Sequence, residues 1–181
     1  MNETRSSPSD LAKAAKSSFE RDDLGAAIEG FRTAKDGYYQ AGDHLMAAEM
    51  ANNLSVALLK ADRPQEGLEE VRGTPQIFLG AEDELRTAMA YGNLASALEA
   101  NTELESAERA LEDAIRIFKK IGDKEHLMHS VRALSQLQLR RGRPLEAVTT
   151  MQGGLDQQSK LNVKNRLLRS ILSIPSRLLG R

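Results

Sequence analysis

The chain contains no cysteine and no tryptophan, and it has only four phenylalanines and three tyrosines. The lack of cysteine excludes disulfide bridges, thiolate metal sites and cysteine nucleophiles. Only five prolines occur in 181 residues, and we expect them at turns or near helix ends. Ala, Leu, Glu, Lys, Arg and Gln dominate instead, and these residues favour helix. The composition therefore predicts an all-α protein with one ordinary core.

Long apolar stretches are also missing. No uninterrupted run approaches the ~20 residues that span a bilayer. Residues 1–10 are polar and lack the apolar core of a signal peptide. We therefore expect a cytoplasmic protein that is neither transmembrane nor secreted by a cleaved signal, with the inner face of a membrane as a second location if its tail binds lipid.

Charge is distributed unevenly along the chain. The net charge is −1, but no acidic residue follows Asp156. Six basic residues lie in the last 22 positions: Lys160, Lys164, Arg166, Arg169, Arg177 and Arg181. An acidic body with a basic end indicates two surfaces with different partners.

The sequence repeats with a period of 40 residues. Three aspartates align at this spacing, each before a helical pattern: Asp43, Asp83 and Asp123. Two sets of mostly small residues also align, one at Ala15, Ser55, Ala95 and Ser135, the other at Ala27, Gly67, Ala107 and Ala147. Four copies of one pattern at a constant period predict a repeat protein.

Each copy is predicted to form two helices. In the third copy, Asp83 is a suitable N-cap for a first helix, because its side chain can accept hydrogen bonds from unpaired backbone N–H groups. A second helix starts near Leu104 and ends at Gly122. In two other copies Pro64 and Pro144 open the second helix, where proline is tolerated. The aligned small residues let the paired helices approach closely.

The spacing Tyr91-x-x-Leu94-Ala95-x-x-Leu98, followed by Ala107-x-x-x-Leu111, resembles the tetratricopeptide repeat. The resemblance covers about residues 9–161. The period departs from the usual ~34 residues, and the usual closing proline is missing. Longer repeats of this kind occur in kinesin light chains and bacterial peptide-sensing regulators. The resemblance implies a superhelix of about four helical hairpins over 9–161, between a disordered arm at 1–8 and a basic amphipathic helix at 162–181.

In the tetratricopeptide family the first helix of each pair lines a concave groove. The resemblance places eight candidate partner-binding residues there: Lys13, Lys16, Asn52, Asn53, Met89, Asn93, His129 and Arg132. Asn53 and Asn93 are the main candidates, since a side-chain amide can pair with a peptide unit of any sequence. Alternatively, these asparagines satisfy polar groups of neighbouring helices. The family's clamp for chaperone-tail carboxylates is rejected, because only Asn53 matches its pattern.

Catalysis is not expected. His126 and His129 share a helix face with Glu125 beside them, but no third metal ligand is evident. No phosphate-binding glycine loop follows a strand, and no nucleophile turn is present. We therefore expect no enzyme activity, no metal and no cofactor.

The basic tail has three interpretations. On a helical wheel, residues 161–179 place leucines and isoleucines on one side and arginines on the other. The tail could cap the last repeat, bind an anionic membrane surface, or dock onto an acidic partner. Its candidate contact residues are Lys164, Arg166, Leu168, Arg169, Leu172 and Arg177. Nucleic acid is not expected, because the body is acidic and the tail has no aromatic residue.

These features together predict a non-catalytic adaptor that binds a peptide or helix of a partner protein in its groove and is tethered by its tail. The alternative is a structural subunit of a larger complex, docked through its convex face and tail.

Overall fold

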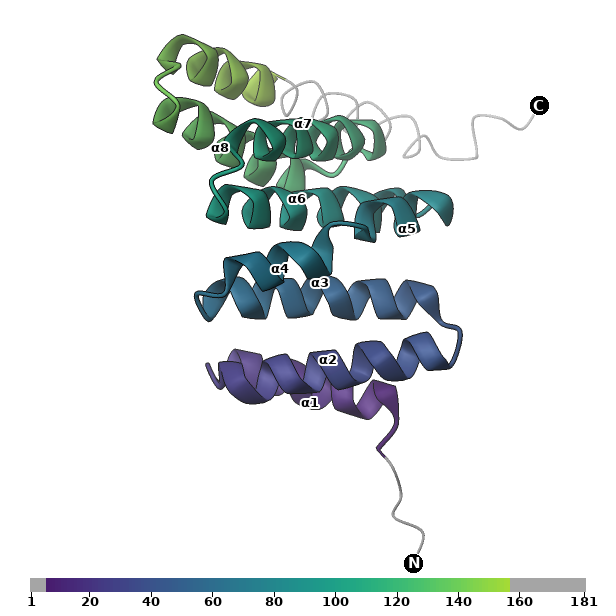
Figure 1. The fold of residues 1–181 in the computed structure, drawn as a ribbon. Coiled ribbons are helices and arrows are strands. Elements are labelled where there is room, and N and C mark those ends of the chain that lie inside the picture. The colour runs from purple at the N-terminus through teal and green to yellow at the C-terminus, as the bar shows by residue number, and fades with distance from the viewer. Residues whose placement is uncertain (1–5, 157–181) are drawn as a thin grey trace, which may run out of the picture. The chain divides into compact units, whose positions relative to one another are not determined.

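The computed structural model describes residues 6–156, and in this range the chain is helical with no strand. Eight helices follow one another: α1 (Pro8–Glu20), α2 (Leu24–Gln40), α3 (His44–Lys60), α4 (Pro64–Val71), α5 (Thr74–Gly80), α6 (Glu84–Ala100), α7 (Leu104–Ile121) and α8 (Lys124–Arg140) (Figure 1). Residues 144–156 are helical as well. The predicted all-α class is confirmed.

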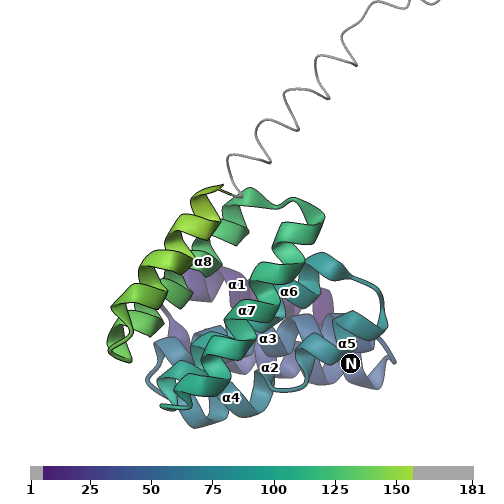
Figure 2. The same cartoon turned by 90° about the horizontal axis from the view of Figure 1, so that it is seen from above.

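The chain forms two compact units, Met1–Ile117 (unit 1) and Phe118–Arg181 (unit 2). In unit 1 the helices stack in chain order, and α2 packs between α1 and α3 (Figures 1 and 2). Helix α6 contacts α3, α4 and α5. No helix within residues 6–156 is long and apolar enough to cross a membrane.

The aspartates that align at the 40-residue period are N-caps, as predicted. Asp43, Asp83 and Asp123 each accept a hydrogen bond from the backbone N–H three residues later, at 3.0, 2.9 and 3.1 Å. These caps begin α3, α6 and α8. Each one satisfies a backbone donor that has no partner inside its helix.

A residue with positive φ recurs every 20 positions. The series is Asp22, Gly42, Asp62, Glu82, Thr102, Gly122 and Gly142, with φ between 57° and 77°. Each lies in the turn that follows a helix. The left-handed conformation ends one helix so that the chain can reverse into the next. The 40-residue repeat therefore consists of two helices and two turns of equal spacing.

Both sets of aligned small residues are buried, as expected. A Cβ added to Gly67 would lie 3.2 Å from the carbonyl oxygen of Ser55. In the last copy, Ser135 Oγ donates a hydrogen bond to the carbonyl oxygen of Ala147 at 2.9 Å. The two helices of each of these copies thus lie close together.

The second helix of the second copy departs from the prediction. It is broken at Arg72–Gly73 into α4 and α5, with Pro75 at the start of α5. One continuous helix was expected across this segment. A proline is not tolerated in a helix interior, so the helix ends before Pro75 and a new helix starts with Pro75 in its first turn. After the break, Phe78 is buried in a cluster with Ala48 of α3 and Ala90 of α6.

Candidate functional site

The predicted groove residues lie on the first helix of each pair. In unit 1, Lys13 and Lys16 are on α1, Asn52 and Asn53 on α3, and Met89 and Asn93 on α6. His129 and Arg132 are on α8 in unit 2. The exposed side chains among them are Lys13, Lys16, Met89, His129 and Arg132. Asn53 and Asn93 are half-buried, and Asn52 is buried.

Asn52 connects three helices of unit 1. Its Nδ2 donates to the carbonyl oxygen of Ala48 at 3.0 Å, one turn earlier in α3. Its Oδ1 lies 3.2 Å from Oγ1 of Thr74, at the start of α5, and accepts a bond from Nδ2 of Asn93 in α6 at 3.3 Å. A buried amide that made no hydrogen bonds would destabilise the fold. Asn52 therefore serves packing and is not available on the surface.

Asn53 and Asn93 differ in their surroundings. The side-chain amide of Asn93 donates one of its two hydrogens to Asn52. For this hydrogen the alternative interpretation holds, namely that the asparagine satisfies a polar group of a neighbouring helix. Asn53 makes no side-chain hydrogen bond to any residue between 6 and 156. Because it is half-buried on α3, its amide retains donor and acceptor capacity for another molecule.

Ion pairs join neighbouring repeats in unit 1. Nη1 of Arg86 lies 3.2 Å from Oε2 of Glu49, which links α6 to α3, and Nε of Arg86 lies 2.7 Å from Oδ2 of Asp83. The Arg86 backbone N–H, and then its guanidinium, hold the pKa of the Asp83 carboxyl below its ordinary value. Lys60 of α3 pairs with Asp22 at 2.6 Å. Because the side chains of these pairs are partly exposed, the pairs contribute little to stability.

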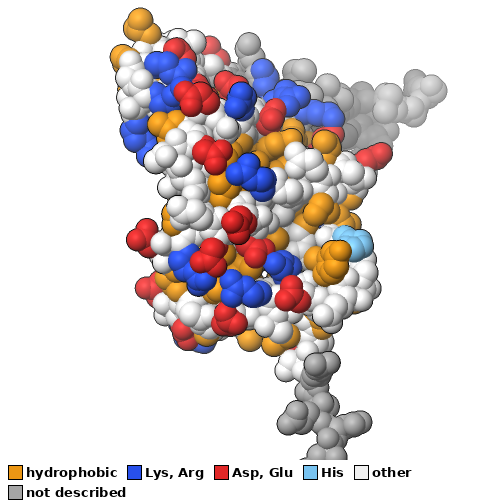
Figure 3. Space-filling view, viewed as in Figure 1, with side chains coloured by type: hydrophobic (Ala, Val, Ile, Leu, Met, Phe, Trp, Pro, Cys, Tyr) orange, Lys and Arg blue, Asp and Glu red, His pale blue; other side chains and the backbone are white. Residues whose placement is uncertain are grey.

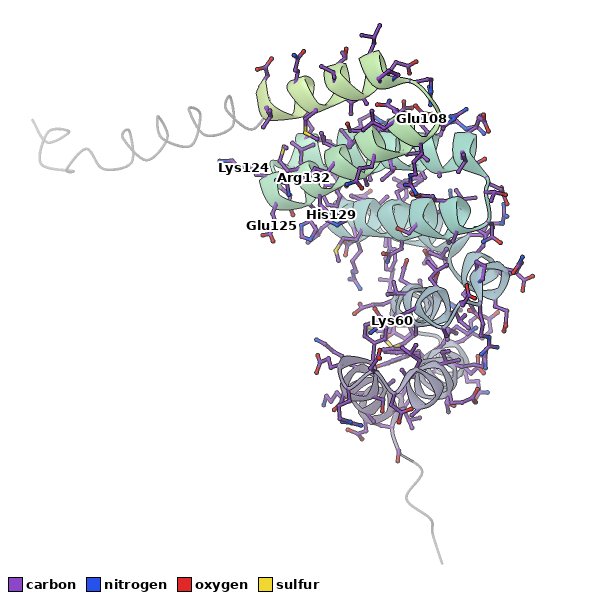
Figure 4. The ribbon with its side chains drawn as sticks, turned by 90° about the vertical axis from the view of Figure 1, so that its left-hand side faces the viewer. Lys60, Glu108, Lys124, Glu125, His129 and Arg132 are labelled. Carbon is purple, nitrogen blue, oxygen red and sulfur yellow. The ribbon has the colours of Figure 1, made fainter. Side chains whose placement is uncertain are left out.

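In unit 2, His129 and Arg132 occupy one face of α8, since residues three apart on a helix are neighbours (Figure 4). The side chain of His126 instead contacts other residues of unit 2. Its Nδ1 lies 2.8 Å from Oδ2 of Asp123, and its ring stacks on Phe118 with centroids 5.3 Å apart. Within the described range, no three His, Asp or Glu side chains are grouped to bind a metal ion.

A pocket of about 440 Å³ in unit 1 was not predicted from the sequence. It lies between α2, α3 and the broken second helix, and none of the predicted groove residues lines it. Its lining comprises Lys35, Asp36, Tyr39, His44, Ala47, Ala48, Ala51, Glu69, Glu70, Gly73, Thr74 and Ile77. The dipeptide Thr74-Pro75 after Gly73 is the sequence signal for the helix break beside it.

The pocket has an apolar floor and a charged rim. Alanines of α3 form the floor, with exposed Tyr39 and Ile77 beside them. At the rim, Nζ of Lys35 lies 2.7 Å from Oε2 of Glu70. Figure 3 shows acidic and basic side chains interspersed on one face of unit 1, with apolar side chains between them.

The predicted tail contacts lie outside the described residues: Lys164, Arg166, Leu168, Arg169, Leu172 and Arg177. The same holds for most of the predicted arm, because α1 begins at Pro8, with Ser7 as its N-cap. The roles assigned to these residues stay predictions.

Comparison with known proteins identifies the fold. No protein-family model and no curated protein matches the sequence. Among solved structures, the apo form of RapI superposes with a TM-score of 0.78 at 14% identity, over 92% of this chain and 62% of RapI. A putative kinesin light chain from Podosopora anserina with nearly identical TPR-like repeats gives 0.72 at 19% identity, over 83% of this chain and 74% of that chain.

A Rap protein complexed with Competence and Sporulation Factor gives a TM-score of 0.73 at 15% identity, over 86% of this chain and 43% of that protein. The chain thus spans less than two thirds of the two Rap structures. At these identities the likeness shows the fold, which is a tetratricopeptide-like array of helical hairpins.

Proposed function

We propose that this chain, whose fold is tetratricopeptide-like, is a non-catalytic adaptor that binds a peptide or helix of a partner protein along its first helices. The observation that supports this most is the set of exposed and half-buried side chains on α1, α3 and α6. They combine two lysines, an amide without a partner among the described residues, and an exposed methionine. These side chains can bind a ligand that presents backbone amides, carboxylates and apolar side chains.

Individual residues have distinct roles in this proposal. The Asn53 amide pairs with a peptide unit of the ligand, because it can donate and accept at once. Met89, which is 44% exposed, contributes a flexible apolar contact. Lys13 and Lys16 attract acidic groups of the ligand. Asn52 is excluded from direct binding because it is buried, and it acts by holding Asn93 in place.

The structural neighbours support the class of ligand. One Rap structure is complexed with Competence and Sporulation Factor, and another, a conjugation gene regulator of the plasmid pLS20, is in complex with the Phr* peptide. This chain covers 43% and 41% of those two proteins. Peptide binding by the same arrangement of hairpins is therefore a proposal here.

Selection from a phage-displayed peptide library against the full chain tests the proposal. The tightest peptide is then measured by fluorescence anisotropy against Asn53→Ala and Met89→Glu. We expect each variant to weaken binding by about tenfold or more, the effect of losing ~1.4 kcal/mol of contact. Thr33→Ala is the matched control, because Thr33 is exposed on α2 and its hydroxyl bonds only the carbonyl oxygen of Glu29 within its own helix.

Circular dichroism of each variant confirms that the fold is kept. If the selected peptide binds all variants as it binds the parent chain, the first-helix face is not the binding site. If instead substitutions on the second helices abolish binding, the alternative of a subunit docked through its convex face is favoured.

A further inference from the structure

Apolar side chains lie exposed on the last described helix, residues 144–156. The exposed fractions are 84% for Leu145, 54% for Val148 and 52% for Leu155. The spacing of three and seven residues places them on one helix face. Leu145 lies at a position that is exposed in every copy, since its equivalents Gly25, Gln65 and Glu105 are exposed as well. Exposed Val148 and Leu155 instead indicate a surface normally covered by another element.

The other copies show what covers this face. The residues one, two and three periods before Val148 are Glu108, Leu68 and Ile28, and their exposed fractions are 8%, 5% and 3%. Ile28 belongs to a core cluster with Met50, Leu54 and Leu58 of α3. In that copy the first helix of the next copy therefore covers the second helix. Val148 differs because no described helix follows residue 156.

The repeat period shows where the next first helix begins. First helices start at His44, Glu84 and Lys124, so the following one starts at Lys164. Five hydrophobic residues of α8 are buried: Leu127, Met128, Val131, Leu134 and Leu137. The residues 40 positions after the first four are large and apolar, namely Leu167, Leu168, Ile171 and Ile174, whereas the equivalent of Leu137 is Arg177. Pro175 follows Ile174, and a proline is not tolerated in a helix interior.

We propose that residues 164–174 form the first helix of a fifth repeat, which covers the Val148 face of residues 144–156.

The absence of cysteine from the chain permits a direct test. Val148→Cys and Thr149→Cys are made in the full chain, and the rate of thiol labelling by a maleimide is measured for each. Thr149 is the matched control, because it is exposed here and so are its equivalents Glu29, Glu69 and Arg109. We expect the thiol of Val148→Cys to react at least about tenfold more slowly than that of Thr149→Cys, since a covered residue reacts only through local opening. Equal rates would overturn the covering helix.

A second substitution separates covering from other causes of slow labelling. Leu167→Asp with Ile171→Asp removes the apolar contacts of the proposed helix. Added to Val148→Cys, it should raise the labelling rate to that of Thr149→Cys. Added to Thr149→Cys, it should leave the rate unchanged. If the thiol at position 148 stays slow in this background, something other than residues 164–174 covers the face, and the proposal fails.

Discussion

Nδ2 of Asn93 donates a hydrogen bond to Oδ1 of Asn52 at 3.3 Å, across 41 positions of the chain. The two residues are not equivalent in the repeat, because the residue one period before Asn93 is Asn53. The bond joins the neighbouring first helices α3 and α6. Only the second copy has an asparagine at the position of Asn52. The equivalents of Asn52 in the other copies are Ala12, Gly92 and Arg132.

Asn52→Ala is expected to lower the free energy of unfolding by about 1–3 kcal/mol, because it removes a buried side chain whose amide bonds Ala48 and Asn93 and leaves the Asn93 amide without that acceptor. The Thr74 hydroxyl keeps its bond to the carbonyl oxygen of Val71. Asn53→Ala, at the next residue, should change it by only about 0.5 kcal/mol or less. Urea unfolding followed by circular dichroism measures both. Similar losses for the two variants would contradict the assignment of Asn52 to the fold and Asn53 to the surface.

Two helix-interior glycines should respond in opposite directions to alanine. A Cβ on Gly92 of α6 meets nothing within 4 Å, so Gly92→Ala should stabilise the protein by about 0.5–1 kcal/mol through helix propensity. A Cβ on Gly30 of α2 would lie 2.8 Å from Cβ of Ala15. Gly30→Ala should therefore destabilise the packing of α2 on α1 by about 1–3 kcal/mol.

The same unfolding measurement compares these two glycine variants. Because the residue change is identical, any general effect of Gly→Ala on the unfolded chain cancels between them. A stabilising Gly30→Ala would mean that α1 moves away from α2 at little cost.

Turn residues offer a third test. Thr102 has φ 62°, a conformation that costs an L-residue about 1–2 kcal/mol, and more for a β-branched side chain. Thr102→Gly relieves this strain, but it also stabilises the unfolded state by about 0.4–1 kcal/mol, because glycine has more conformational freedom in the unfolded chain. We expect a net gain of about 0.5–1 kcal/mol in the free energy of unfolding. Gly122→Ala, with φ 77° at its position, should lose stability, and a loss in both variants would exclude strain at Thr102.

Acid should weaken the protein partly through Asp83. Its pKa is lowered in the folded state, first by the backbone N–H of Arg86 and also by the guanidinium of Arg86. The stabilising contribution of this carboxylate is therefore complete above the unfolded pKa of about 4 and is lost as the pH falls through the lower folded pKa. Asp83→Asn retains a good N-cap without the charge.

Urea midpoints at pH 7 and pH 3 measure this effect. The Asp83→Asn variant should be less stable than the parent chain at pH 7, and the difference should shrink at pH 3. Parallel pH profiles for the two proteins would show that the ionised form of Asp83 is not favoured by folding.

Features that depend on local chemistry could be predicted from the sequence. The N-cap role of Asp43, Asp83 and Asp123 follows from residue type and position, and the burial of the aligned small residues follows from the period. The fold class, the two-helix repeat and the turn at Gly122 were predicted for the same reason. Each of these features is set within a few residues of the chain.

Features that depend on packing between helices were predicted less well. A helical wheel places the adjacent Asn52 and Asn53 about 100° apart, but it does not show which of them meets another helix. Burial of Asn52 depends on Thr74 and Asn93 from other helices. The helix break at Gly73 had a local signal in Thr74-Pro75, but the regular period outweighed it. The pocket beside this break could not be predicted, because it depends on where α5 packs after the break.

The left-handed residues at every twentieth position have a consequence for how such a protein changes in length. A 40-residue segment that starts and ends at equivalent turns, such as 83–122, contains one complete hairpin with its own cap and its own chain reversal. Duplication or deletion of that segment would join chain ends that already have matching backbone conformations. The array can therefore gain or lose one hairpin in a single duplication or deletion, because the joined ends already have the backbone conformation of the turn.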